Sequence, residues 1–238
     1  MRCVKIEYVN SDSDLYDLEI DGGNNNYVAE GIVVHNTFAC FGYVAQMDDP
    51  DFMNGKMFAA SKGLMNQGLV FKYNDENRAK NVYVRTMERL FSDQFDQFRK
   101  TFHDLIDAGH DFKIYFLGEI YGEGVQDLQY GKKGKHFALF DICIVIGSTK
   151  RWCNPESVRK IADNFGFDTV PSIYEGPFSQ QELERARDGK DTLSNSHVRE
   201  GVVVRLMEER TDPSIGRVML KAVSPKYLLR KGNTTEYT

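Results

Sequence analysis

No stretch of the sequence is apolar for long enough to cross a membrane, and Met1–Asn10 mixes charged with apolar residues, unlike a secretory signal. Cysteine is scarce as well, because Cys3, Cys40, Cys143 and Cys153 show neither metal-ligand spacing nor a disulfide framework. Internal repeats and low-complexity segments are also missing. We therefore expect a protein of the reducing cytoplasm with no membrane partner, in which Cys40 is a buried strand residue.

The residues that are present suffice for a folded core, and their charge is unevenly distributed. Hydrophobic types make up 41% of the 238 residues, enough for one large domain or two smaller ones. Residues 1–36 contain 2 basic and 7 acidic side chains, which leaves 28 of the 30 basic and 28 of the 35 acidic groups for residues 37–238. The whole net charge of −5 thus belongs to the first segment, which predicts a basic partner for it.

Alternation and helical periodicity predict an α+β fold. Strands are expected at residues 4–8, 16–20, 27–29, 32–35, 37–47, 56–63, 113–120, 136–146, 201–206 and 218–223. Residues 77–108 carry apolar side chains mostly at three- and four-residue steps, which predicts one long amphipathic helical region. Two further helices are expected, one from Asn154-Pro155 to Gly166 and one opened by a capping box at Ser179 and Glu182.

The chain from Gly31 to Phe38 reads GIVVHNTF, so that a short apolar strand delivers His35 and Asn36 directly to the hydroxyl residue Thr37. The side-chain amide of Asn36 can attack its own backbone carbonyl and cut the chain, with the hydroxyl of Thr37 as acyl acceptor beforehand. His35 stands next to the scissile bond and can protonate the departing nitrogen. Taken alone, the tripeptide also fits a strand that runs into an ordinary turn.

The surroundings of this junction favour the reactive interpretation. The stretch LYDLEIDGGNNNYVAEGIVVHN closely resembles the C-terminal splicing block of inteins. Residues 1–36 together look like the C-terminal fragment of a naturally split intein with its own initiator methionine. The resemblance implies a partner polypeptide that carries the N-terminal intein fragment. Short strands over 36 residues cannot bury a core by themselves, so the segment should need such a partner.

Four short stretches of residues 37–238 contain side chains suited to chemistry on a nucleotide. Gly118-Glu119 and Glu200-Gly201 put a carboxylate beside a glycine, Phe140-Asp141 places a ring and an acid in an apolar strand, and Lys221 sets a cation in another. Each stretch alone is more often structural. Together, in this order, they resemble the motifs of the nucleotidyltransferases, a superfamily that includes ATP-dependent ligases. The neighbouring residues resemble those of RNA ligases from Thr37 to Lys231.

This resemblance implies ATP and Mg²⁺ as cofactors, RNA as substrate, and a role for each matching residue. Glu119 would bind the ribose, and Phe140 would stack on adenine. Asp141 would be the acidic member of the third motif, and Glu200 would help to hold the metal. Lys221 would contact phosphate. Lys62, in Ser61-Lys62-Gly63, would belong to an early strand motif, and Lys226 would replace a second lysine that many ligases carry where Val223 stands here.

ATP-dependent ligation also needs a lysine that carries the adenylate, which family members place in a Lys-x-x-Gly-Thr motif. Here the ligase-like segment opens with Thr37-Phe38, so we expect that lysine on another polypeptide, with the intein lying between the Gly and the Thr of the motif. The resemblance implies a small all-β intein fragment over residues 1–36 and an antiparallel-sheet adenylation domain over residues 37–238 that lacks its N-terminal strand and the motif lysine. The chain alone should neither splice nor ligate, and trans-splicing would complete an RNA ligase.

Two basic clusters are candidate phosphate contacts for RNA, although each also fits a solvated surface. They are Lys132, Lys133, Lys135 and His136, and Lys221, Lys226, Arg230 and Lys231. Two other functions stay open. A DNA ligase shares the core motifs, and a non-catalytic nucleotide- or nucleic-acid-binding module would carry residues 1–36 as a mere β extension.

Overall fold

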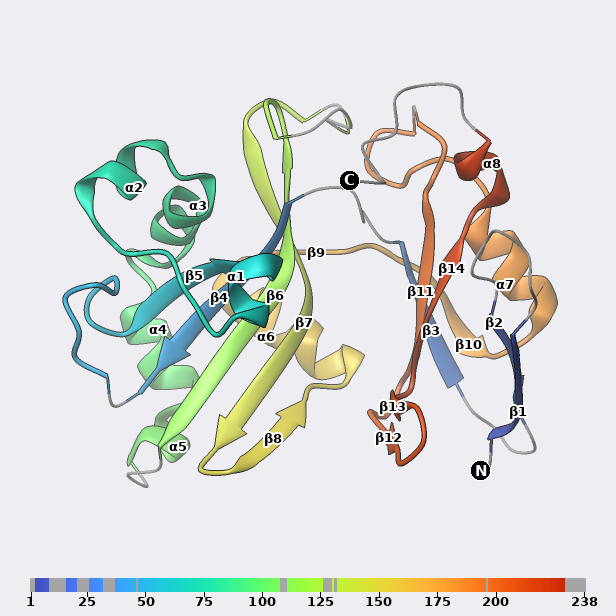
Figure 1. Cartoon of the computed structure of the whole chain (residues 1–238), viewed down its shortest axis with the longest axis horizontal. Helices are drawn as coiled ribbons and strands as arrows, with labels where there is room; N and C mark the ends of the chain where they lie inside the picture. The colour runs from blue at the N-terminus through green and yellow to red at the C-terminus, as the bar shows by residue number, and fades with distance from the viewer. Residues whose placement is uncertain are drawn as a thin grey trace.

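The computed structural model of the chain describes residues 3–8, 16–20, 26–31, 37–45, 47–107, 111–125, 130, 132–195 and 197–229. Two larger β-sheets lie side by side, each with helices on its outer side (Figure 1). Helices and mostly antiparallel strands thus form separate layers, which confirms the predicted α+β class. None of the helices in the described ranges is both long and apolar enough to span a membrane.

The first sheet has the strand order β5-β4-β6-β7-β8, and its neighbouring strands are antiparallel. A short sixth strand, β9, pairs in parallel with β7. Ala39, Phe41 and Tyr43 face the helical side of this sheet, whereas Phe38 and Cys40 face the other side. The strand bounds are β4 (Thr37–Val44), β5 (Met57–Ser61), β6 (Phe112–Gly122), β7 (Lys135–Ile146), β8 (Thr149–Trp152) and β9 (Asp168–Thr169).

The predicted long helical region at residues 77–108 is wrong in its continuity, because four shorter helices occupy it. They are α2 (Asp75–Lys80), α3 (Val82–Phe91), α4 (Phe95–Thr101) and α5 (His103–Asp107). Asn81 is the cause of the first break: its backbone is extended, and its side chain accepts hydrogen bonds from the backbone N–H of Tyr83 (2.9 Å) and Val84 (3.1 Å). Asparagine therefore starts a new helix here instead of continuing the old one.

Phenylalanine rings join these helices to the first sheet. Phe98 of α4 lies 5.6 Å from the ring of Phe91, 5.7 Å from Phe116 and 4.7 Å from Phe165, measured between ring centroids. Phe98 itself is 1% exposed. Phe165 belongs to α6 (Pro155–Phe165), which begins at the Asn154 cap and ends at Gly166 in a left-handed conformation (φ 66°), as predicted. The apolar periodicity therefore predicted the buried face correctly, although not the breaks.

The second sheet has the strand order β10-β3-β11-β14. A second, smaller hydrophobic core lies between this sheet and α7. Val202, Val204 and Leu206 of β11 pack there with Ala186 of α7. The side chain of Ser179 accepts a hydrogen bond from the N–H of Glu182 (3.1 Å), which confirms the predicted helix start. The bounds are β3 (Asn26–Gly31), β10 (Ser172–Pro177), α7 (Gln180–Arg187), β11 (Gly201–Leu206), β12 (Thr211–Asp212), β13 (Gly216–Arg217), β14 (Met219–Val223) and α8 (Pro225–Leu228).

The first segment contributes to two different sheets. Strands β1 (Cys3–Tyr8) and β2 (Tyr16–Ile20), both predicted from the alternation, form an antiparallel pair. Strand β3 instead lies inside the second sheet, where it pairs with β10 on one edge and β11 on the other. The strand expected at residues 32–35 falls outside the described residues. The division at Asn36 and Thr37 stays a prediction, but the backbone pairing already connects the two predicted segments.

Candidate functional site

The candidate site lies on the face of the first sheet that is turned away from helices α3–α6. Cys40, Ala60 and Leu117 form an apolar cluster on this face, and Phe140 and Trp152 pack against it. An open pocket of about 500 Å³ lies here, with Cys40, Leu117 and Trp152 among its walls. Its size and apolar lining are typical of a small-molecule site.

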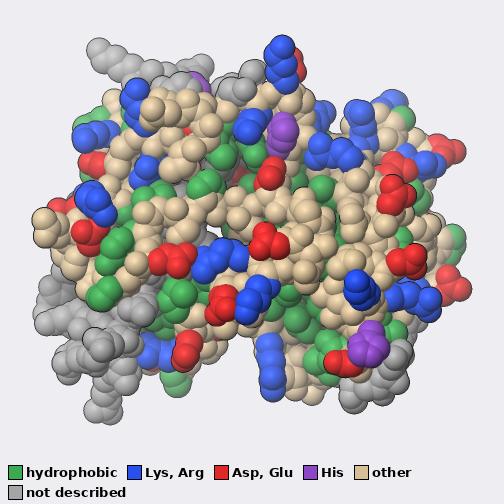
Figure 2. Space-filling model, turned by 180° about the vertical axis from the view of Figure 1, so that it is seen from behind, with side chains coloured by type: hydrophobic (Ala, Val, Ile, Leu, Met, Phe, Trp, Pro, Cys, Tyr) green, Lys and Arg blue, Asp and Glu red, His purple; other side chains and the backbone are tan. Residues whose placement is uncertain are grey.

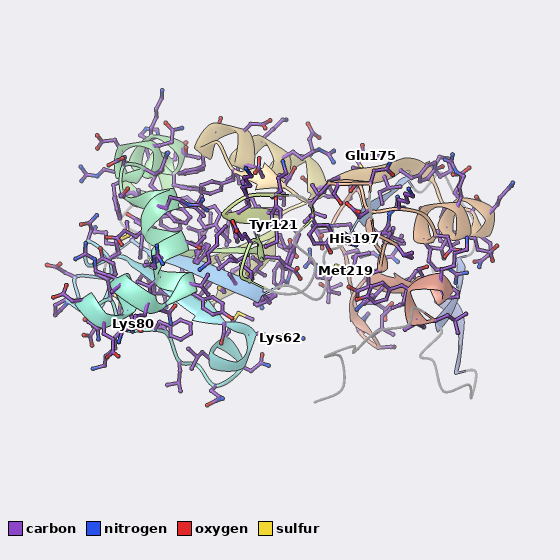
Figure 3. The ribbon with its side chains drawn as sticks, turned by 90° about the horizontal axis from the view of Figure 1, so that it is seen from above. Lys62, Lys80, Tyr121, Glu175, His197 and Met219 are labelled. Atoms are coloured by element: carbon purple, nitrogen blue, oxygen red, sulfur yellow. The ribbon has the colours of Figure 1, made fainter. Side chains whose placement is uncertain are left out.

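The second sheet and its loops stand opposite this face. Figure 3 shows Tyr121 of β6 on one side and His197 and Met219 on the other. The ring of Tyr130 connects the two sides, with its centroid 6.1 Å from Tyr121 and 6.4 Å from His197. Seen from behind, the molecule has an opening between its two halves that charged side chains of both signs border (Figure 2). The site is therefore a cleft between the two sheets with a charged rim, and the predicted contacts Glu119, Phe140, Glu200 and Lys221 do not line the apolar pocket on the first sheet.

Glu119 enters this cleft from β6. Its Cα pairs with Phe38 of β4 on one side and with Ala138 of β7 on the other, and the residue is 5% exposed. The preceding Gly118 allows this arrangement, because a Cβ there would lie 2.4 Å from the ring of Phe137 and 2.5 Å from the carbonyl oxygen of Ala138. The glycine of the predicted Gly118-Glu119 motif is thus required because β7 leaves no room for a side chain at position 118.

Phe140 occupies a bulge in β7. The register changes from Leu117 opposite Asp141 to Gly118 opposite Leu139, so Phe140 has no residue directly across from it on β6. Its half-buried ring lies 5.9 Å from the ring of Phe38 at an angle of 48°. Bulges re-aim side chains next to functional sites. This one leaves an aromatic ring at the edge of the cleft, where a planar base could stack on it.

Asp141 takes part in a buried network of four charges. Its carboxylate is bonded to Arg217 of β13 and lies 3.4 Å from the guanidinium of Arg205, and Glu209 is bonded to both arginines. Burial by itself would lower the pKa of Arg217, but hydrogen bonds and charges from Glu209 and Asp141 outweigh it and raise the pKa. The side chain of Asp141 is 4% exposed. The described contacts of Asp141, the predicted acidic residue of the third motif, therefore link β7 of the first sheet to β11 of the second sheet and to β13.

Arg205 and Arg217 were not assigned a role from the sequence. Arg205 is 2% exposed and donates to the carbonyl oxygens of Phe140 (2.9 Å) and Cys153 (2.8 Å). Phe140 lies in β7 of the first sheet, and Cys153 directly follows β8 of the same sheet. The guanidinium of Arg217 lies 4.2 Å from the ring centroid of Trp152, close enough for a cation–π contact. An arginine inside the apolar run Gly201–Leu206 is the signal that could have revealed the first of them, because such a charge is seldom buried without partners.

Glu200 and Lys221 form a pair on the second sheet. The Nζ of Lys221 lies 2.9 Å from Oε1 of Glu200, and the side chains are 43% and 3% exposed respectively. Gly201 brings β11 and β14 this close, because a Cβ there would lie 2.1 Å from the carbonyl oxygen of Ala222. The ammonium group is thus fixed by one carboxylate while part of the lysine stays open to a ligand. Two motifs far apart in the sequence meet here.

The remaining predicted residues lie farther out. Lys62 is exposed and does not lie in a strand: β5 ends at Ser61, whose hydroxyl accepts from Leu64 N–H (3.3 Å) and so starts α1 (Lys62–Asn66). Figure 3 shows Lys62 reaching out from this helix. Lys226 is 69% exposed and lies 3.4 Å from Asp188. Lys132 and Lys133 are exposed, Lys135 and His136 are half-buried.

The predicted splice junction is only partly described. Thr37 is the first residue of β4, with its Cα opposite Ile120 of β6. His35, Asn36, Arg230 and Lys231 lie outside the described residues. Cys40 is buried as expected, and burial raises the pKa of its thiol to about 12. Cys40 is therefore a buried, weakly acidic wall residue of the pocket, which makes it a poor nucleophile.

No group of three or more His, Cys, Asp or Glu side chains in the described ranges is placed to hold a metal ion by itself. Glu200 can supply one carboxylate oxygen, the kind of ligand that Mg²⁺ prefers. Mg²⁺ in nucleotide enzymes commonly takes its other ligands from phosphate oxygens and water. The residues present thus fit a metal that arrives with a nucleotide.

Comparison with known proteins agrees with this geometry. The sequence model of a family described as RNA ligase matches residues 52–223, well over half of the chain. A search of curated proteins finds no match. Among solved structures, the RNA ligase of Naegleria gruberi is similar as a mutant with ATP and Mn (19% identity, TM-score 0.54), as an apo mutant (19%, 0.55) and with PPi (18%, 0.53). Each alignment covers 86% of this chain and 51% of the ligase, so the chain spans about half the length of those ligases. At this identity the likeness shows a shared fold.

Proposed function

The chain belongs to the RNA ligase family, and on this premise we propose that it is the larger part of an ATP-dependent RNA ligase that protein splicing completes. The observation that carries the ligase part is the cleft between the two sheets. Phe140 and Glu119 lie on one side of it and the pair of Glu200 and Lys221 on the other, with Arg205 connecting β11 to the backbone of Phe140. An aromatic platform, a buried carboxylate and a partly exposed cation are the groups that a binding site for a nucleoside triphosphate requires.

In this proposal each residue has a stated task. Phe140 stacks on the adenine, Glu119 binds the ribose, Lys221 contacts the phosphates and Glu200 contributes an oxygen ligand to the metal. The metal supplies charge neutralisation at the phosphates when bound. A mutant of the Naegleria gruberi ligase has been solved with ATP and Mn. We extend ATP and a divalent ion to this chain, with Mg²⁺ as the ion.

The nucleophilic lysine comes from the partner in this proposal. Thr37 accepts the upstream acyl group, His35 donates a proton to the leaving nitrogen, and cyclisation of Asn36 releases residues 1–36. The position of Thr37 supports this reading, because β4 begins there and its next residue, Phe38, pairs with Glu119. A lysine four residues upstream in a joined Lys-x-x-Gly-Thr sequence would thus arrive beside the nucleotide cleft.

Mass spectrometry of this chain mixed with a candidate precursor tests both parts. The precursor should end its upstream sequence in Lys-x-x-Gly, followed by an N-terminal intein fragment. We expect a product joined to Thr37, release of residues 1–36, and no joined product from Asn36→Ala. Addition of ATP should then add one AMP to the joined product, but not to this chain alone. Absence of joining with any such precursor would overturn the splicing part of the proposal.

Substrate preference is tested on the joined product. The family match favours RNA over DNA, so matched nicks that differ only in the sugar should be sealed faster when they contain RNA. A joined product that binds nucleotide but never gains AMP would instead support the non-catalytic binding module.

A further inference from the structure

Strand β3 is an interior strand of the second sheet, although it belongs to the segment that splicing would remove. Its Cα atoms pair with β10 from Asn26 opposite Pro177 to Glu30 opposite Ser172. On its other edge, they pair with β11 from Tyr27 opposite Leu206 to Gly31 opposite Val202. Figure 1 shows β3 in this place. The sheet that carries Glu200 and Lys221 is therefore completed by residues 26–31.

Removal of residues 1–36 would open a gap in this sheet. Neighbouring strands lie about 4.8 Å apart, so β10 and β11 would face each other across roughly 9.6 Å with unpaired backbone groups. Within the described residues β10 has no other strand partner, whereas β11 keeps β14. Unpaired buried N–H and C=O groups are costly, and the gap thus demands another strand.

We infer that the upstream segment joined to Thr37 supplies this strand, and that β3 holds its place until splicing. This inference rests on the splicing function proposed above. Gly31 and Thr37 are separated by residues 32–36, and the joined upstream residues reach Thr37 from the same direction along the chain. The incoming strand should be about as long as β3, which has 6 residues, and should end about as far before Thr37.

The sheet also specifies which side chains the incoming strand should carry. Val202, Val204 and Leu206 of β11 face the core under α7. Residues directly opposite each other in an antiparallel pair lie on the same face of the sheet. The upstream segment should therefore place apolar residues at the alternate positions that come to lie opposite these three. The positions between them, opposite Val203 and Arg205, lie on the face turned toward the first sheet.

Splicing then requires an exchange of strands. Both edges of β3 are occupied by β10 and β11, so no edge is left for pairing with the partner's intein fragment. The first segment must fold with that fragment for Asn36 to react. Residues 26–31 thus have to leave the ligase sheet before the chain is cut, and the upstream strand takes over the gap.

A reversible disulfide tests this exchange. Val28 and Glu175 are directly opposite each other in β3 and β10, so Val28→Cys with Glu175→Cys should lock β3 into the sheet on oxidation. We expect the oxidised protein to lose joining to Thr37 and the reduced protein to recover it. The matched control is Ile146→Cys with Thr149→Cys, a pair that links β7 to β8 and should splice in both redox states.

The outcomes separate this inference from the splicing proposal. An oxidised lock that joins as well as its reduced form, or a pair that cannot be oxidised, would overturn the inference. Failure of the reduced and unmodified chains to join would overturn the splicing proposal instead. Hydrogen exchange on the joined product gives the second readout: residues 172–177 of β10 should stay protected. Loss of that protection would show that the upstream segment does not fill the gap.

Discussion

Replacing Arg205 by methionine tests whether the buried charge network holds the two halves of the molecule together. The guanidinium donates to two carbonyl oxygens of the first half and to two carboxylates, at 2.6 Å from Glu209 and 3.4 Å from Asp141. Methionine keeps the approximate length of the side chain and removes all of these donors. Arg217 remains bonded to both carboxylates, so their charges keep a partner.

The expected loss follows from the groups that lose their donor. A buried carbonyl oxygen left without a partner costs about 1–3 kcal/mol, and two are affected here. Removing one member of a buried ion pair costs about 3–5 kcal/mol when nothing compensates, and Arg217 compensates in part. We therefore expect the free energy of unfolding to fall by about 3 kcal/mol. With a urea m-value of about 3 kcal/mol/M, the midpoint should fall by about 1 M.

Urea unfolding followed by circular dichroism measures this shift. The matched control is Arg185→Met, which removes a surface arginine that is 71% exposed and bonded to Glu182 on the same helix. Exposed pairs contribute about 0.2–1 kcal/mol, so this variant should shift the midpoint by a few tenths of a molar at most. If the two variants lost equal stability, the network would not be what joins the sheets.

Three further results are expected. Gly201→Ala should lower stability by about 1–3 kcal/mol in urea unfolding and reduce adenylation of the joined product, because the new Cβ meets the Ala222 carbonyl at 2.1 Å; Gly63→Ala, with its nearest atom at 3.9 Å, is the neutral control. Acid should destabilise the protein through Glu209. Burial acts to raise the pKa of this carboxyl, but hydrogen bonds and charges from Arg217 and Arg205 outweigh it and lower the pKa, so the stabilisation present above about pH 4.5 is lost as the pH falls further. Glu209→Gln should reduce the change of the urea midpoint between pH 6 and pH 3, and a pH dependence equal to that of the unmodified chain would contradict this. Cys40→Ala should splice like the unmodified chain while Thr37→Ala gives no joined product, since burial raises the pKa of the Cys40 thiol to about 12 and leaves it a poor nucleophile; loss of joining in Cys40→Ala would refute that reading.

Local sequence signals predicted those elements whose cause is also local. Asn154 and Gly166 bound α6, and Ser179 opens α7, because a capping side chain needs only its own neighbours in the chain. The same rule explains two errors. Ser61 and Asn81 also cap helices, but the longer apolar patterns around them predict a strand through Lys62 and one helical region at residues 77–108.

The candidate site was predictable in its residues but not in its arrangement. Glu119, Phe140, Glu200 and Lys221 were found as motifs, and the structure places them on two facing sheets. Nothing in their spacing showed that Lys221 lies 2.9 Å from Glu200, or that Phe140 sits in a bulge. Arg205 and Arg217 were missed because their partners are up to 76 residues away in the chain.

The sequence by itself predicted the RNA ligase family and most of the strands and helices, which the family match and the structure confirm, since these depend on residue types at short spacing. The junction at Asn36 and Thr37 and the nucleotide contacts stay predictions of the same kind. Only the tertiary structure decided that β3 completes the sheet carrying Glu200 and that a buried charge network joins the two halves. Strand partners and buried ion pairs depend on which distant segments meet, and that choice is made by the packing of the whole chain.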